Sequence, residues 1–147
     1  METTGHDYKY IEWKSAEEMH FSSLQWISEL NFIKDEHLFF EDMLKEYTLP
    51  IIESDLFSKV KDLVNRLTES KQKVDAILKK TTGHRNGLQI MIDGINQIED
   101  EKEYKEDHRS LLKEVHKFSR DYNTLKKEIF EAVSQALKKQ KQKKLLN

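Results

Sequence analysis

A near absence of helix-breaking residues limits this chain to a helical fold more than any other feature does. Its 147 residues include one proline, Pro50, and four glycines. A β-sandwich needs a turn about every 8–12 residues, and such turns draw heavily on glycine and proline. We therefore expect an all-α protein with a single domain, residues 1–147.

The apolar residues recur at alternating spacings of four and three, as in helices that pack side by side in coiled-coil-like bundles. Such stripes run through residues 19–47, 56–77, 88–98 and 108–132. The spacing predicts an antiparallel bundle of long amphipathic helices.

Two local signals predict where the first helices begin and end. Ser15 and Glu18 form a capping box, so we expect the first helix to start there. Pro50 pushes the residue before it towards extended geometry, which predicts that this helix ends near Thr48. Ser54 is the expected cap of the second helix.

A helix–helix turn is predicted at residues 81–87, because Gly83, Gly87 and two threonines gather there. Asn86 and Gln89 have the spacing of a second capping box, which would restart the chain as a helix. With this turn, the pattern favours a four-helix bundle.

No glycine or proline follows Gly94, so the sequence leaves the division of the last third open. The acidic residues 99–107 and the polar residues 119–123 are both candidate breaks, and the stripe is expected to fray after Leu137. Without a break, the alternative is a bundle of three long helices.

The two ends differ from the rest in composition. Residues 1–13 are expected to form an N-terminal tail, and residues 138–147 a basic C-terminal helix end. The first residues lack the apolar run of a signal peptide, and no apolar run approaches the ~20 residues of a membrane span. With no cysteine in the chain, these features predict a soluble, cytoplasmic protein.

Composition and motifs also bear on chemistry. The formal net charge of -2 provides no field that would attract nucleic acid to the whole molecule, so nucleic acid is not a favoured partner. Without cysteine, thiolate metal sites and cysteine nucleophiles are excluded. No phosphate-binding glycine loop or serine-nucleophile motif occurs, so we expect no enzyme activity, no cofactor and no recognisable small-molecule substrate.

Histidines at apolar positions are the candidates for a metal site, although we expect them to serve as core residues. His37 and Glu41 have one half of a hemerythrin-like His-x-x-x-Glu pattern, and no His-x-x-x-His pair accompanies it. A bundle could still bring His84 or His108 beside them, which leaves a degenerate carboxylate–histidine, di-iron-like metal-binding bundle as an alternative function.

The leading hypothesis is a non-catalytic protein-interaction or structural module, with a protein partner that includes a second copy in a homodimer. Phe32 and Phe39 lie off the main stripe of the first helix and are candidate contact residues. A third hypothesis is an adaptor for nucleic acid or a membrane surface. Its candidate residues are Lys138, Lys139, Lys141, Lys143 and Lys144. No motif is specific enough to indicate a family.

Overall fold

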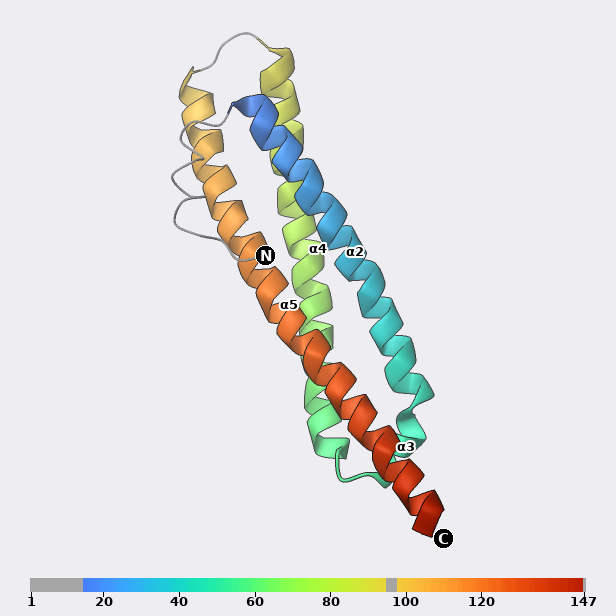
Figure 1. Ribbon diagram of the computed structural model, residues 1–147. Helices are drawn as coiled ribbons and strands as arrows, with labels where there is room; N and C mark the ends of the chain where they lie inside the picture. The colour runs from blue at the N-terminus through green and yellow to red at the C-terminus, as the bar shows by residue number, and fades with distance from the viewer. Residues whose placement is uncertain (1–14, 95–97, 147) are drawn as a thin grey trace. The chain divides into compact units, whose positions relative to one another are not determined.

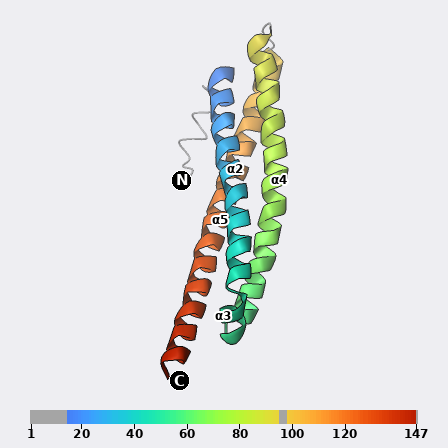
Figure 2. The same ribbon diagram turned by 90° about the vertical axis from the view of Figure 1, so that its right-hand side faces the viewer.

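The structure is a computed structural model that describes residues 15–94 and 98–146 of the chain. Four helices and no strand occur in these residues, which confirms the all-α fold class. The helices are α2 (Ala16–Glu46), α3 (Thr48–Glu53), α4 (Phe57–Asp93) and α5 (Ile98–Leu146), as Figures 1 and 2 show. Among the described residues, no helix combines the length and apolar character that crossing a bilayer requires.

Contacts divide the chain into two compact units. Of the described residues, unit 1 combines 15–33 with 73–94 and 98–120, and unit 2 combines 34–72 with 121–146. The three long helices each contribute one segment to both units, because each of them continues across a boundary. The assignment of the whole chain to one domain stays a prediction.

The capping box predicted at the start of the first helix is present. The backbone N–H of Glu18 donates to Ser15 Oγ at 3.2 Å, and the backbone N–H of Ser15 reaches Glu18 Oε1 at 3.5 Å. Two N–H groups at the helix start are thereby satisfied, and α2 begins at the next residue, Ala16.

The chain bends as expected before Pro50, but the residues next to it are helical. Tyr47 leaves helical geometry, with φ -98° and ψ 21°, and α3 begins directly after it. The expectation that the chain is extended before Pro50 is wrong, because the proline lies in the first turn of α3, where no N–H is needed. The prediction that Ser54 caps the next long helix is wrong, because α4 begins only at Phe57 and Ser54 is the C-cap of α3. Its Oγ accepts from the N–H of Leu56 and donates to the carbonyl of Ile51.

The turn predicted at residues 81–87 and the capping box predicted at Asn86 are wrong, since both lie inside α4. Thr81 fits the helix because its hydroxyl donates to the carbonyl of Ile77 at 2.7 Å. Gly87 has a packing role: a Cβ there would lie 2.7 and 2.8 Å from two ring carbons of Tyr104, on α5. The glycine at position 87 therefore serves to let the Tyr104 ring approach the helix closely, and it does not form a turn.

Neither candidate break in the last third interrupts α5, which runs for 49 residues. The apolar stripe frays near Leu137 as expected, since no residue from 138 to 146 is buried, but α5 itself continues to Leu146. Lysine, glutamine and leucine are good helix formers, and Lys139 and Lys143 make contacts that hold this segment. In the part of the chain that the structure describes, the long helices therefore number three, as in the alternative arrangement, and the fourth helix there is the six-residue α3.

The core of unit 1 is built from the stripes that the sequence shows. Lys80 pairs with Glu114 and His84 with His108, so α4 and α5 run antiparallel within this unit. The buried apolar side chains are Met19, Trp26, Leu30, Ile33, Val74, Ile77, Leu88, Leu111, Leu112, Val115 and Phe118.

Unit 2 has its own core. Glu36 of α2 accepts from Tyr122 and pairs with Lys126, both on α5, and Phe40 packs against Phe130 further along the same two helices. These contacts show that α2 and α5 run parallel within the unit. The largest contributors to this core are Phe40, Leu44, Ile51, Val60, Leu63, Leu67, Tyr122, Leu125, Ile129 and Val133.

The two glycines inside α4 should respond to alanine with opposite signs. Gly83→Ala is expected to raise the free energy of unfolding by about 1 kcal/mol, because alanine loses less backbone freedom in a helix. Apart from the neighbouring residues and the backbone of the same helix, no atom lies within 4 Å of the added Cβ. Gly87→Ala should lower the free energy of unfolding by about 1 kcal/mol, because the Tyr104 ring must move.

Urea unfolding followed by circular dichroism measures both effects. As a control, Gly87→Ala should lose its penalty when Tyr104 is also replaced by alanine. If both glycines respond alike in the wild-type background, the Tyr104 ring does not pack against Gly87.

Candidate functional site

A hydrogen-bonded pair of histidines lies in the core of unit 1. His84 Nε2 and His108 Nδ1 are 3.0 Å apart, and both side chains are buried. The Trp26 ring stacks on His108 with a centroid separation of 4.5 Å, and the Tyr104 ring lies 5.9 Å from His84. Three helices thus enclose the pair, with α2 providing the Trp26 face.

The environment favours the neutral form of His84. Burial lowers the pKa of His84, and the negative charge of Asp107 opposes that shift only in part. A neutral imidazole can donate from one nitrogen and accept at the other, so one ring of the pair can donate to the second. The hydrogen bond between the rings satisfies His84 Nε2 and His108 Nδ1 inside an otherwise apolar layer.

The third buried histidine, His37, lies in unit 2 and has different partners. Its Nε2 is 2.9 Å from Ser70 Oγ on α4, and its ring meets the Tyr122 ring edge-on at 5.1 Å. Burial and the hydrogen bond to Glu36 raise the pKa of Tyr122, so the phenol keeps its proton and donates it at 3.0 Å. The hydrogen bonds of His37 Nε2 and of the Tyr122 hydroxyl link helices within the unit.

The four candidate metal ligands are not brought together. His84 and His108 bond to each other in unit 1, whereas in unit 2 His37 bonds to Ser70 and Glu41 pairs with Lys71 at 2.5 Å. In residues 15–94 and 98–146, no three histidine or carboxylate side chains converge in a way that could hold a metal ion. The half-pattern of His37 and Glu41 therefore has no supporting geometry.

The lowered pKa of His84 predicts sensitivity to acid. Below pH 6.5 the His84 side chain is protonated in the unfolded chain but stays largely neutral in the folded chain. The free energy of unfolding therefore decreases as the pH falls through 6.5, and the whole contribution of His84 is present above that value. Between pH 7.5 and 5.5 this group can remove up to about 1.4 kcal/mol from the free energy of unfolding. Urea unfolding at both values should show a smaller loss in His84→Gln, and an equal loss in both proteins would contradict the assignment.

Exposed aromatic side chains are the most unusual surface feature. Five of the seven phenylalanines are exposed, whereas most large apolar residues of the stripes are buried. Phe32 and Phe39 are among them, in keeping with their positions off the stripe. The sequence reading missed the other three, Phe21, Phe57 and Phe130.

On the α2 segment of unit 1, the exposed apolar residues form a line. Phe21 and Phe32 are 62% and 63% exposed, and they stand 11 residues apart, which is about three helical turns. Glu18 and Glu29 each precede one of these rings by three residues, so they form an acidic line beside it. This repeated Glu-x-x-Phe spacing is the signal that could have identified Phe21 from the sequence.

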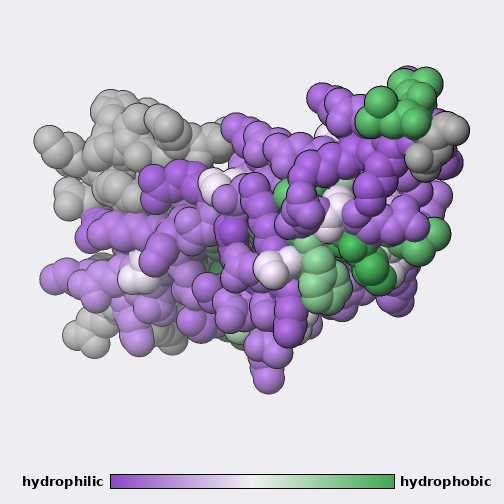
Figure 3. Space-filling model, turned by 90° about the horizontal axis from the view of Figure 1, so that it is seen from below, coloured by the Kyte–Doolittle hydropathy of each residue, from purple (hydrophilic) through white to green (hydrophobic). Residues whose placement is uncertain are grey.

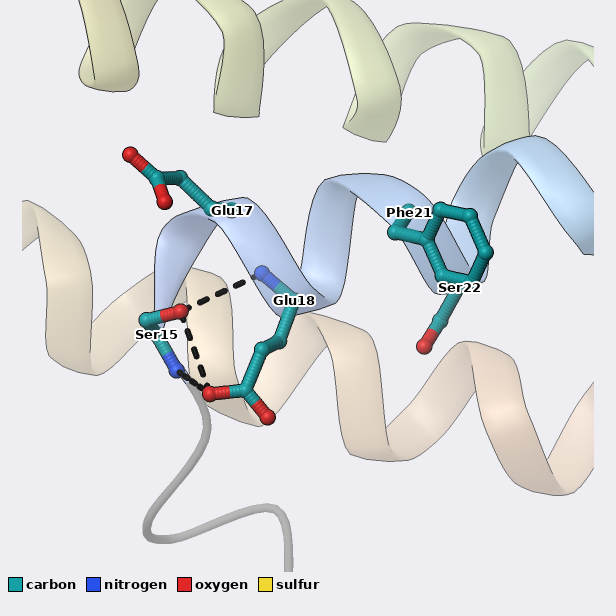
Figure 4. A pocket seen from close by; sticks show the side chains of 5 residues that line it. All are labelled: Ser15, Glu17, Glu18, Phe21 and Ser22. Atoms are coloured by element: carbon teal, nitrogen blue, oxygen red, sulfur yellow. Dashed lines mark hydrogen bonds between the residues drawn. The ribbon is translucent and has the colours of Figure 1, made fainter.

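The start of this line borders a shallow hollow of about 470 Å³, lined by Ser15, Glu17, Glu18, Phe21 and Ser22. Figure 4 shows the capping hydrogen bonds on one side of α2 and the Phe21 ring further along the helix. The hollow holds carboxylates and one aromatic ring, which suits a cationic and apolar ligand rather than an anion.

The five candidate lysines lie at the end of α5, in unit 2. Lys139 Nζ is 3.6 Å from a carboxylate oxygen of Asp55, and Lys143 Nζ donates to the backbone carbonyl of Glu53 at 3.1 Å. The helix end is therefore held against α3 and the residues that follow it. Sequence reading missed two exposed residues there, Leu49 and Ile52, since both belong to a segment expected to be a short connection.

Comparison of the chain with family models, with curated proteins and with solved structures finds no match.

Proposed function

We propose that this chain is a non-catalytic protein-interaction module that binds a basic amphipathic helix of another protein on the α2 segment of unit 1. The observation that carries the proposal is the exposed line of Phe21, Leu24 and Phe32. Aromatic side chains are enriched at the centres of protein interfaces, where their burial supplies much of the binding free energy. Large aromatic side chains that are exposed in the single chain therefore indicate a surface that a partner covers.

The charge of the same segment specifies the partner. Between residues 16 and 33, Glu17, Glu18 and Glu29 are exposed and there is no lysine or arginine. A partner helix with leucine-like residues on one face and lysine or arginine beside them would bury the rings and face the carboxylates. An acidic helix would meet like charges.

The buried histidines support a non-catalytic role. His84 and His108 are enclosed by apolar and aromatic rings in unit 1, and His37 is engaged with Ser70 in unit 2. General acid–base catalysis requires a group within hydrogen-bond reach of a bound substrate, and these groups are hydrogen-bonded within the core instead.

Two synthetic peptides test the proposal. Both are amphipathic helices with the same leucine face, one with lysine and one with glutamate on the polar face, and binding is followed by fluorescence anisotropy. We expect the lysine peptide to bind at least about ten-fold more tightly, a difference of 1.4 kcal/mol. The double variant Phe21→Ser with Phe32→Ser should weaken that binding by at least about ten-fold, since it removes the two exposed rings that the partner would bury.

The matched control removes two exposed phenylalanines from unit 2, by Phe39→Ser with Phe57→Ser, and should leave the affinity unchanged. Equal loss in both double variants would mean that binding does not depend on α2 of unit 1. Light scattering adds a second check on the 17.6 kDa chain. A dimer that dissociates on Phe21→Ser with Phe32→Ser would make a second copy the occupant and contradict a basic partner.

A further inference from the structure

The net charge of the whole chain conceals a strongly cationic region in unit 2. Residues 47–61 and 134–146 contain seven lysines against the two carboxylates Glu53 and Asp55, a local formal charge of +5 in a chain of net charge -2. These residues form α3, the start of α4 and the end of α5. We call them the lysine–leucine surface of unit 2.

Large apolar side chains are exposed within the same surface. Leu145 and Leu146 are 78% and 86% exposed, and three further side chains are more than half exposed, Leu49, Ile52 and Phe57. The space-filling view in Figure 3, seen from below, shows green apolar areas set among purple hydrophilic residues. Water-exposed leucine, isoleucine and phenylalanine beside lysine make an amphipathic surface rather than a simple charged one.

Contacts between helices bring these residues to one place. The hydrogen bond from Lys143 to the Glu53 carbonyl and the ion pair of Lys139 with Asp55 hold the end of α5 beside α3 and the start of α4. The side chain of Asp55 is almost fully exposed, so its pairing with Lys139 is screened and weak. Lys139 therefore retains the ability to bind another anion.

We propose that the lysine–leucine surface of unit 2 binds the surface of an anionic lipid bilayer. The lysines would contact lipid phosphates and carboxylates, because polybasic segments are attracted to the negative potential of anionic leaflets. Leu49, Ile52 and the Leu145–Leu146 pair would enter the boundary between headgroups and acyl chains. The expected affinity for the bilayer is the sum of the attraction between lysines and anionic headgroups and the burial of the aliphatic side chains.

The apolar residues decide between a bilayer and other polyanions. A nucleic acid offers phosphates to lysine, but sequence-independent binding of single strands uses aromatic rings that stack on bases, and aliphatic side chains do not serve this role. Four of the five exposed apolar residues here are leucine or isoleucine. Aliphatic side chains gain free energy from leaving water, which a bilayer boundary allows.

Vesicle co-sedimentation with the full chain tests this proposal. We expect vesicles with about 30 mol% phosphatidylserine to bind at least about ten-fold more protein than phosphatidylcholine vesicles, and this excess to fall in about 0.5 M salt. Replacing Lys138, Lys139, Lys141, Lys143 and Lys144 with glutamine should abolish the excess. Leu145→Ser with Leu146→Ser should reduce binding by about ten-fold although no charge changes.

The matched control has five other exposed lysines replaced by glutamine, all in unit 1, and should bind as the wild type does. These are Lys73, Lys79, Lys102, Lys113 and Lys117. Circular dichroism establishes that each variant is folded. The proposal is overturned if the two vesicle types bind equally, if the control loses as much binding, or if the Leu145 and Leu146 change has no effect. If the protein binds a single-stranded RNA more tightly than the vesicles, and the Leu145 and Leu146 change does not weaken that binding, the surface is a nucleic-acid surface instead.

This inference is independent of the proposed protein interaction. The variants that test it lie in unit 2, whereas Phe21 and Phe32 lie in unit 1. Loss of lipid binding with retained binding of the lysine peptide would overturn only this inference, and the reverse result would overturn only the proposed function.

Discussion

Replacing Phe40 with alanine is expected to lower the free energy of unfolding by about 3–5 kcal/mol, the usual range for truncating a buried phenylalanine. Phe40 is 0% exposed and is among the largest fully buried side chains of unit 2. Its ring lies 5.2 Å from that of Phe130 and 6.5 Å from that of Tyr122, both on α5. The variant loses these contacts and leaves a cavity that rigid helices fill only in part. Urea unfolding measures the change.

The adjacent residue provides a matched control, because it has the same side chain on the same helix. Phe39 is 57% exposed, so Phe39→Ala should cost about 1 kcal/mol or less. Part of that cost comes from its edge-on contact with the Phe40 ring, at 5.6 Å. Equal costs for the two variants would show that Phe40 is not a core residue of unit 2.

His108→Ala is expected to cost about 3–4 kcal/mol in unit 1, from two sources. The variant removes the ring that stacks on Trp26, and it leaves His84 Nε2 buried without its hydrogen-bond partner. Removing one member of a buried polar pair costs more than the pair itself contributes. Thermal or urea unfolding of the full chain gives the value.

His116→Ala is the control on the same helix. His116 is only partly buried, next to the core residue Val115, so its loss should cost about 1 kcal/mol or less. A further variant, His84→Leu with His108→Leu, replaces both members with apolar side chains. Its cost should be smaller than that of His108→Ala, since no buried polar atom is left alone. If His108→Ala were as mild as His116→Ala, the histidine pair would contribute nothing to the core.

Local patterns predicted much of the candidate surface as well as the fold class. The positions of Phe32 and Phe39 off the stripe indicated either a first helix buried on two sides or a contact with another subunit, and both rings are exposed. The run of lysines was visible as a charge pattern. The apolar half of the lysine–leucine surface was not, because Leu49 and Ile52 join the lysines only through the contacts of α5 with Glu53 and Asp55, some 90 residues earlier in the chain.

What the sequence determined by itself was the helical class, the start of α2 and the burial of His37 and His108. These follow from hydrogen bonds and apolar spacing within a few turns of one helix, which are local properties. Only the tertiary structure decided that α4 continues through Gly83 and Gly87, and which partner each buried histidine has. Those outcomes depend on residues far apart in sequence, such as Tyr104 against Gly87 and Ser70 against His37, whose contact free energies outweigh local turn propensity.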